Sequence, residues 1–335
     1  MIQLAETGWI PDAVCRWGIR RLCRERLASL APGSSRRVAE QMRRSPLAIA
    51  VDEANEQHYE LPPQFFRIAL GSHLKYSACD WSEGVNSLDE AEASMLQLSS
   101  ERAQLADGME ILELGCGWGS WSLWMAERYP NSSVTSVSNS ASQRDFILAR
   151  AEERGLGNLT VVTCDMNSFE TEQRFDRVVS IEMFEHMRNY ETLLGRVASW
   201  LKPTGKLFVH IFCHREHAYF FETDGERDWM ARYFFTEGLM PSFDLLEKFD
   251  DQLELESEWF VDGRHYEKTA NAWLRRLDAR RGEVQRIFED AYGKDAAVWI
   301  QRWRLFFMAC AESFGFNGGS EWHVGHYLFQ PKVAE

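Results

Sequence analysis

The sequence predicts an α/β protein in which helices cover both faces of a parallel sheet. From residue 88 onward, short apolar runs alternate with segments of helical periodicity, at intervals of roughly 20–30 residues. Such alternation is typical of βαβ units, in which each helix returns the chain so that successive strands run parallel. A glycine-rich turn follows the first apolar run, where sheets of this kind place a ligand.

The individual elements follow from the positions of these runs. We expect, in chain order, a helix over 88–104, a strand over Ile111–Leu114, a helix over Trp121–Arg128, a strand over Val134–Val137, a helix over Gln143–Glu153, strands over Thr160–Thr163 and Arg177–Ile181, a helix over Tyr190–Leu201 and a strand over Lys206–Phe212. Residues 12–30 have helical periodicity, with Cys15, Ile19, Leu22, Cys23 and Leu30 near one face.

The remaining segments are mostly helical by the same criteria. Residues 225–250 and 266–314 are rich in Trp, Phe and Arg and predict helices, and His323–Phe329 predicts a closing strand. We therefore expect an N-terminal helical arm over 1–55 and a main domain over 56–335. A helical lobe around 214–315, inserted in the second half as a lid, is expected to serve the substrate.

Charge and cysteine content exclude several classes of function. The 335 residues include 37 Lys+Arg and 51 Asp+Glu, for a net charge of −14, which disfavours general binding to nucleic acid. The first 50 residues are the exception, with nine arginines and four acids. No apolar stretch of 18 or more residues occurs, so stable membrane insertion is not expected. Seven scattered cysteines without a CxxC pair predict free thiols and a cytoplasmic protein.

The glycine-rich turn indicates a cofactor. Gly115, Gly117 and Gly119 form a GxGxG pattern between the first strand and its helix, where the backbone turns sharply and lies close to a ligand. A dinucleotide site prefers GxGxxG, and its pyrophosphate would be repelled by Glu113. An acid at this position suits a cationic ligand, such as the sulfonium of S-adenosylmethionine.

Polar residues after the next two strands extend the predicted cofactor site. Asn139 and Gln143 follow the second strand, where a ribose is usually bound. After the third strand, Asp165 is expected to accept a hydrogen bond from the adenine amino group and Met166 to pack on the ring.

The fourth strand delivers three titratable groups to the same edge of the sheet. Glu182, Glu185 and His186 follow Ile181, which we place beside the cofactor, and burial would raise the pKa of a glutamate enough to make it a useful base. His210 and His214 look like metal ligands, but they fall where the fifth strand leaves the sheet, and we expect no metal.

At this point the sequence resembles a known family. Together, the motifs EQHYELP (56–62), LKYS (74–77), ELGCGWGS (113–120), SIEMFEHM (180–187) and WHVGHYLF (322–329) are similar to those of the cyclopropane-fatty-acid-synthase-like methyltransferases. Longer segments resemble most the plant coclaurine and tetrahydroprotoberberine N-methyltransferases: SIEMFEHMRNY (180–190), HIFCHREHAYFFE (210–222), DWMARYFFTEGLMPS (228–242) and DGRHYEKTANAW (262–273). The resemblance implies a class I methyltransferase fold, Rossmann-like, with a seven-stranded sheet. It also implies that Tyr76 and Ser77 lie near the methionyl end of the cofactor, and Glu182, Glu185 and His186 around an amine.

Lipid-modifying members of this family are the principal alternative. Their bicarbonate site is matched here by Glu185, His210, Tyr266 and also Cys310. Ala78, however, stands where those enzymes have a cysteine, with Cys79 one place later. The additional Glu182 and the acidic chain favour an amine acceptor.

The sequence therefore predicts an S-adenosylmethionine-dependent methyltransferase that acts on the nitrogen of an aromatic or heterocyclic, isoquinoline-like amine and releases S-adenosylhomocysteine. The acceptor contacts we expect are Phe184, His210, Tyr266, Trp303 and Phe307. A cyclopropane-fatty-acyl-phospholipid synthase or a related lipid-methylating enzyme is the alternative function, and a non-catalytic cofactor-binding protein is a remote one. The expected partner is a small-molecule amine, with a homodimer as one possible assembly.

Overall fold

The computed structural model describes residues 2–48, 61–221 and 229–332, which form two compact units. The sheet unit consists of Pro32–Glu60, Met95–Val261 and Val324–Glu335. The helical unit consists of Met1–Ala31, Leu61–Ser94 and Asp262–His323. The expected boundary between residues 55 and 56 lies outside the described residues, as does most of the EQHYELP motif.

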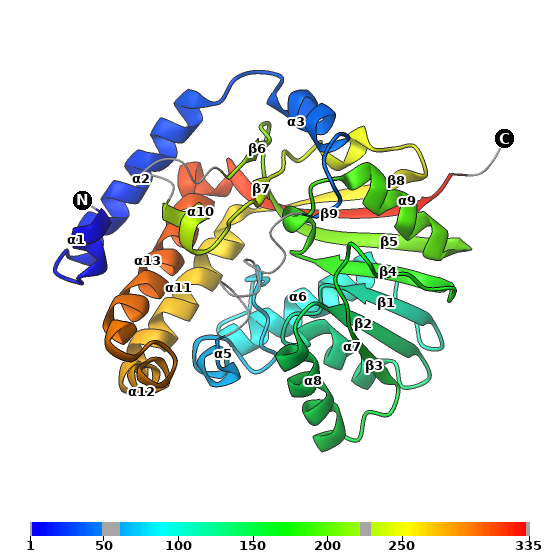
Figure 1. Ribbon diagram of the computed structural model, residues 1–335, viewed down its shortest axis with the longest axis horizontal. Coiled ribbons are helices and arrows are strands. Elements are labelled where there is room, and N and C mark those ends of the chain that lie inside the picture. Colours follow the sequence, from blue (N-terminus) through cyan, green and yellow to red (C-terminus); the bar gives the residue numbers. More distant parts are fainter. Residues whose placement is uncertain (1, 49–60, 222–228, 333–335) are drawn as a thin grey trace. The chain divides into compact units, whose positions relative to one another are not determined.

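A seven-stranded sheet, in the order β3-β2-β1-β4-β5-β9-β8, forms the centre of the sheet unit (Figure 1). Its strands are β1 (Glu110–Leu114), β2 (Ser133–Ser138), β3 (Leu159–Thr163), β4 (Phe175–Ile181), β5 (Leu201–His214), β8 (Leu253–Val261) and β9 (Trp322–Pro331). The pairs among β1 to β5 are parallel, whereas β8 and β9 are antiparallel. A second, small sheet pairs β6 (Tyr219–Phe220) with β7 (Leu239–Met240). Strand order reverses between β1 and β4, and ligands bind at the carboxyl ends of strands on either side of such a switch.

Helices cover both faces of the large sheet, as the alternation of apolar residues requires. On one face, Leu112 and Leu114 contact a core that includes α3 (Ser34–Met42) and α9 (Tyr190–Trp200). On the other face, Ile111 contacts the carboxyl end of α6 (Leu88–Arg102) and α7 (Ser120–Arg128). The helix α8 (Ala141–Glu153) covers β3 on this second face.

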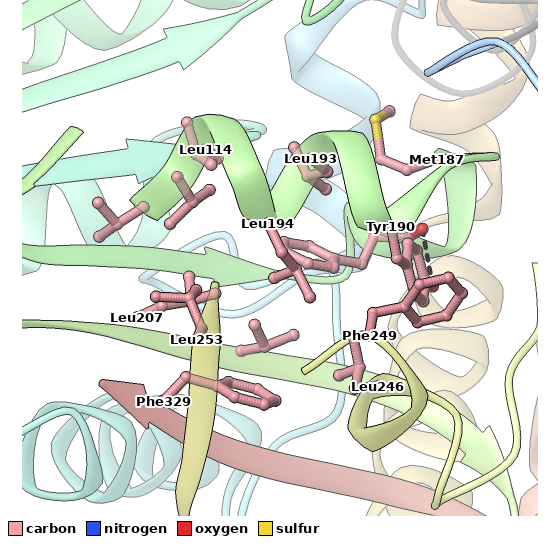
Figure 2. Close-up of a cluster of buried hydrophobic side chains, with 14 of the residues drawn as sticks. Leu114, Met187, Tyr190, Leu193, Leu194, Leu207, Leu246, Phe249, Leu253 and Phe329 are labelled. Carbon is pink, nitrogen blue, oxygen red and sulfur yellow. Dashed lines mark hydrogen bonds between the residues drawn. The ribbon is translucent and has the colours of Figure 1, made fainter. Parts of the chain in front are cut away.

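The larger core lies beneath α9 and is shown in Figure 2. Leu193 and Leu194 of α9 pack with Leu207 of β5 and Phe329 of β9, and each of the four side chains is at most 2% exposed. Burial of each such side chain contributes roughly 1.5–3 kcal/mol. Asn189 caps the start of α9 by accepting a hydrogen bond from the Thr192 amide at 2.9 Å.

The helical unit has a core built largely from aromatic side chains. Its helices are α1 (Ile2–Glu6), α2 (Asp12–Ser29), α5 (Pro63–Ala69), α11 (Gly263–Ala279), α12 (Arg281–Tyr292) and α13 (Ala296–Phe314). Trp303 of α13 lies 4.7 Å from Phe65 of α5 between ring centroids, and Trp273 of α11 lies 5.6 Å from Phe307. Among the described residues, no helix combines the length and the apolar character needed to cross a membrane.

Two sequence-based expectations about elements are wrong in part. Residues 225–250 contain, among the described positions, only a short helix α10 (Trp229–Tyr233), the strand β7 and a 3₁₀ turn at Leu246–Lys248. The apolar side chains of this segment are buried through irregular backbone, with Leu245, Leu246 and Phe249 in the larger core. In α2, Leu22 is 41% exposed, so only Cys15 and Cys23 of the expected face are buried.

Candidate active site

A pocket opens at the carboxyl ends of β1 to β4, at the switch point of the sheet. It contains about 690 Å³ of space, a volume that includes open solvent at its mouth. Its wall is formed by Gly115, Gly117, Val137, Ser138, Asn139, Gln143, Cys164, Asp165, Met166, Glu182, Met183, His186 and Met187. The structure thus brings together eight of the residues that the sequence singled out.

The glycine loop is held against β2 and leaves space where a cofactor would lie. The Gly115 and Cys116 amides donate to the Val137 carbonyl at 3.0 and 3.1 Å. Gly119 is required by packing, because a Cβ there would lie 2.6 Å from Ile147. At Gly117, with φ at +50°, a Cβ would meet no atom of the described residues within 4 Å. This open position in the pocket wall is the cradle expected for the cofactor.

The first turn of α8, which follows β2, supplies a buried donor to the pocket wall. Gln143 is 2% exposed, and its Oε1 accepts a hydrogen bond from the Ser138 hydroxyl at 2.7 Å. Its Nε2 has no hydrogen-bond partner among the described residues. A buried donor without a partner costs free energy unless a ligand accepts from it, so this amide fits a ribose hydroxyl. Asn139 lines the pocket beside it.

The third strand ends in a turn that presents Asp165 and Met166. Asp165 Oδ1 accepts a hydrogen bond from the Asn167 amide at 2.7 Å, which fixes the carboxylate at the pocket wall. Met166 is 8% exposed and belongs to both the pocket wall and the larger core. Both residues therefore line the pocket at the end of β3, and their contacts with an adenine stay a prediction.

Glu182 adopts a backbone conformation that non-glycine residues rarely adopt. Its φ is +45°, in the left-handed region, and its amide donates to the His210 carbonyl at 2.8 Å. Its side chain, 8% exposed, places Oε1 3.4 Å from His210 Nε2. Such strained residues cluster at functional sites, where the surrounding structure holds them in place.

Glu185 and His186 have strongly shifted pKa values. Burial, followed by the nearby charge of Glu182, raises the pKa of Glu185 well above its ordinary value. Burial lowers the pKa of His186 to about 4, although Glu182 opposes that shift. His186 lines the pocket and stacks on Phe235, whereas Glu185 is buried behind it, with an Oε2 that has no partner among the described residues. At neutral pH His186 is therefore a neutral imidazole, and the neighbouring Glu185 binds a proton more readily than an ordinary glutamate does.

Glu113 does not lie in the pocket, contrary to the expectation that it faces the cofactor. It alternates with Leu112 and Leu114, so its side chain points to the other face of the sheet. There it accepts hydrogen bonds from Ser122 and from Ser136, the latter at 2.9 Å. Burial raises its pKa to about 7. Through these two hydrogen bonds, Glu113 of β1 connects that strand to β2 and α7.

Several other expected site residues also lie away from this pocket. In the sheet unit, Ile181 packs against the core around Ile111. Phe184 is fully buried, and its ring centroid lies 5.6 Å from that of Tyr190. The others belong to the helical unit and are buried or packed in its aromatic core: Tyr76, Ser77, Tyr266, Trp303 and Phe307. Their assignment to the acceptor or the cofactor stays a prediction.

Sequence reasoning missed five residues of the pocket wall. Val137 and Ser138 end β2, and Cys164 directly follows β3, so their position at strand ends could have identified them. Met183 and Met187 flank Glu185 and His186 in the SIEMFEHM motif. Met183 lies so close to the glycine loop that a Cβ on Gly115 would lie 2.7 Å from it. No group of three or more His, Cys, Asp or Glu side chains suited to a metal ion occurs in the described part of the chain.

The sheet order and the pocket define the class of protein: an S-adenosylmethionine-dependent methyltransferase. The chain belongs to the mycolic acid cyclopropane synthetase family, whose model matches residues 49–320. It is 37% identical to (S)-coclaurine N-methyltransferase of Thalictrum flavum subsp. glaucum, over 99% of this chain and 95% of that protein. It is 29% identical to the cyclopropane-fatty-acyl-phospholipid synthase of Escherichia coli strain K12, over 80% of this chain and 66% of that protein.

Solved structures agree with this assignment. A crystal structure of coclaurine N-methyltransferase bound to N-methylheliamine and S-adenosylhomocysteine superposes with a TM-score of 0.95, at 35% identity, over 98% of each chain. A mycolic acid cyclopropane synthase complexed with S-adenosylhomocysteine shares the fold, with a TM-score of 0.72 at 20% identity, over 86% of this chain and all of that one. The predicted fold, cofactor and enzyme class, an N-methyltransferase, are confirmed.

Proposed function

We propose that the protein transfers a methyl group to the nitrogen of a free small-molecule amine carried by an aromatic, isoquinoline-like ring system. The observation that carries the proposal is the strained Glu182, which lies near Glu185 and His186 in a pocket whose wall also includes Gly115 and Gly117. The similarity to two (S)-coclaurine N-methyltransferases supports an amine as the acceptor.

Binding the acceptor is assigned to Glu182. A free alkyl amine has a pKa of about 10, similar to lysine, and arrives as an ammonium ion without a lone pair. A carboxylate in a largely buried site attracts this cation more strongly than one in water. Bound S-adenosylmethionine supplies a methyl group already activated by the sulfonium. The pocket residues must hold the amine nitrogen roughly 3–3.5 Å from that carbon.

Removal of the ammonium proton is assigned to Glu185 and His186. The cation beside Glu182 favours ionisation of Glu185, which burial and the charge of Glu182 otherwise disfavour. Once ionised, this carboxylate is a stronger base than an ordinary glutamate, because burial disfavours its charge. His186 is neutral at physiological pH, so it can pass the proton from the amine nitrogen toward Glu185 through its two ring nitrogens.

We also propose that the enzyme acts in the cytoplasm, without nucleic acid, and that it forms a homodimer. All seven cysteines are free thiols, which is usual in a reducing compartment. Cell fractionation tests the location. Size-exclusion chromatography with light scattering tests the assembly, and a monomer at micromolar concentration would contradict that part.

The test of the acceptor class compares amines with lipids. Purified protein is incubated with S-adenosylmethionine and either a panel of isoquinoline-type and aliphatic amines or vesicles of unsaturated phospholipid. We expect S-adenosylhomocysteine and an N-methylated product with the ring-bearing amines, and no methylene or cyclopropane product in the lipid. Lipid modification at a rate matching amine turnover would assign the protein to the lipid-modifying branch instead.

A further inference from the structure

A chain of four polar side chains connects the pocket to the end of α6, entirely within the sheet unit. Glu182 Oε1 lies 3.4 Å from His210 Nε2. The other ring nitrogen of His210, Nδ1, lies 2.8 Å from His326 Nε2. His326 Nδ1 in turn lies 2.8 Å from Nη1 of Arg102. Both histidines are fully buried, on the neighbouring strands β5 and β9.

Arg102 determines the direction of every contact in this chain. A guanidinium donates hydrogen bonds and accepts none, so His326 Nδ1 must be an acceptor and its proton must lie on Nε2. His326 therefore donates to Nδ1 of His210, whose own proton is left on Nε2. The hydrogen of His210 therefore lies on Nε2, the ring nitrogen 3.4 Å from the Glu182 carboxylate, where it acts on that carboxylate by electrostatic attraction, because the two atoms do not meet hydrogen-bond geometry.

The same elements also hold the histidines and Glu182 by other contacts. Arg102 lies over the ring of Trp259, 5.1 Å from its centroid, and Trp259 is paired with His326 across β8 and β9. The His326 ring packs edge-on against Phe208, at 5.1 Å between centroids. The backbone of His210 fixes Glu182 a second time, since its carbonyl accepts the Glu182 amide.

We propose that Arg102 and His326 are positioning residues for the methyl-transfer reaction, acting through His210 to hold the Glu182 carboxylate as an acceptor for the substrate cation. The titratable groups around Glu182 are His210 on one side and Glu185 and His186 on the other. A proton cannot leave along the histidines, because both presented atoms already carry hydrogen and the guanidinium at the far end neither gives up nor takes up a proton. The substrate proton therefore leaves by Glu185 and His186. This division of roles rests on the proposed function, whereas the tautomers of the histidines do not.

The test measures the tautomers of the two histidines and the kinetics of methyl transfer in separate experiments. Nitrogen-15 NMR of the protein without substrate is expected to show His210 and His326 as neutral Nε2–H tautomers that do not titrate between roughly pH 5.5 and 8.5. In Arg102→Met the aliphatic stem remains over Trp259 but the donor is lost. We expect altered tautomer populations of His326 and His210, and a KM for the amine raised about threefold to tenfold with kcat changed less than about twofold. Arg102→Lys restores a donor and should recover most of both readouts.

Arg128→Met is the matched control, because Arg128 also lies over a tryptophan, Trp124, but contacts no histidine in the described part of the chain. It should leave the histidine spectra and KM unchanged. A Nδ1–H tautomer or a titrating imidazolium at either histidine would overturn the positioning chain, whatever the acceptor proves to be. Normal tautomers together with an unchanged KM in Arg102→Met would overturn its role in binding. Absence of methyl transfer to any amine, with the tautomers as described, would instead count against the proposed function.

Discussion

A side chain at position 117 would fill the space assigned to the cofactor. Gly117→Val places a branched side chain in the open part of the pocket wall, and we expect calorimetric affinity for S-adenosylhomocysteine to fall by at least about a hundredfold. The control is Gly155→Val, since Gly155 also has a positive φ and open surroundings but does not line the pocket. Both variants carry similar backbone strain, so equal affinity in the two would remove the loop from the cofactor site.

The three titratable groups of the pocket are expected to separate into binding and proton transfer. Glu185→Gln and His186→Ala should lower kcat by about a hundredfold or more, whereas Glu182→Gln should mainly raise KM. Because burial raises the pKa of Glu185, the kcat of the unmodified enzyme should rise with pH, and this rise should lie above the range in which an ordinary glutamate ionises. Higher pH should partly rescue the first two variants, because more amine arrives neutral. Near-normal kcat in both at neutral pH would show that solvent, not these residues, takes the proton.

Glu113 offers a test of stability against pH. Its pKa rises from 4.5 to about 7 on folding, so its carboxyl contributes stability that is present below pH 4.5 and lost as pH rises toward 7. Glu113→Gln imitates the protonated form at every pH. In urea unfolding the variant should gain up to about 3 kcal/mol over the unmodified protein between about pH 4.5 and pH 8. Cofactor affinity should stay within about threefold, and a larger loss would restore Glu113 to the cofactor site.

At the scale of elements, one carboxylate on α6 stabilises a loop of the helical unit. Glu92 is fully buried and accepts the amides of Gly71, His73 and Lys75, at 2.8, 2.8 and 3.2 Å. Glu92→Ala leaves these donors without an acceptor, and we expect the free energy of unfolding to fall by roughly 3 kcal/mol. Glu90→Ala, which removes an exposed carboxylate from two amides of the preceding turn, should cost much less, because water can replace the lost acceptor. Equal losses in urea unfolding would contradict the importance of burial.

Elements with a strong period were predictable from sequence, and elements fixed by tertiary contacts were not. Strands β1 to β4 lie within two residues of their expected bounds, because parallel central strands are continuous apolar runs. The strand β8 (Leu253–Val261) was not predicted, although its first four residues alternate between leucine and glutamate as a half-buried strand does. Its place in the sheet depends on pairing with β9, 60 or more residues later in the chain. The three helices α11 to α13 confirm the expectation for residues 266–314.

In the candidate site, too, the residues at strand ends were predictable from sequence, whereas the contacts fixed by tertiary structure were not. Strand ends identified Asn139, Gln143 and Asp165, because the carboxyl ends of parallel strands meet at one edge. Glu113 shows the limit of this reasoning, since its distance from the glycines in sequence says nothing of the face to which its side chain points. The contact between His210 and His326 joins residues 116 positions apart, and only the order of strands in the sheet reveals it.

For the molecule as a whole, the net charge of −14 should assist capture of a cationic acceptor. Raising the ionic strength from about 0.01 M to about 1 M shortens the screening length from about 30 Å to about 3 Å. We expect kcat/KM for an alkyl amine to fall at least about threefold over this range, with kcat nearly constant. A ring-bearing amine of low pKa, neutral at the assay pH, serves as control, and an equal fall for both would exclude electrostatic attraction.

The position of β9 between β5 and β8 has a consequence for biosynthesis. While the ribosome is still adding residues before Val324, β5 and β8 have no strand to join them, and two strand edges stay open. The nascent chain therefore exposes a surface that other unfinished chains, or a chaperone, can bind. The same late segment carries His326, so the pocket acquires its full set of internal contacts only when translation has passed that codon and the last strand has entered the gap.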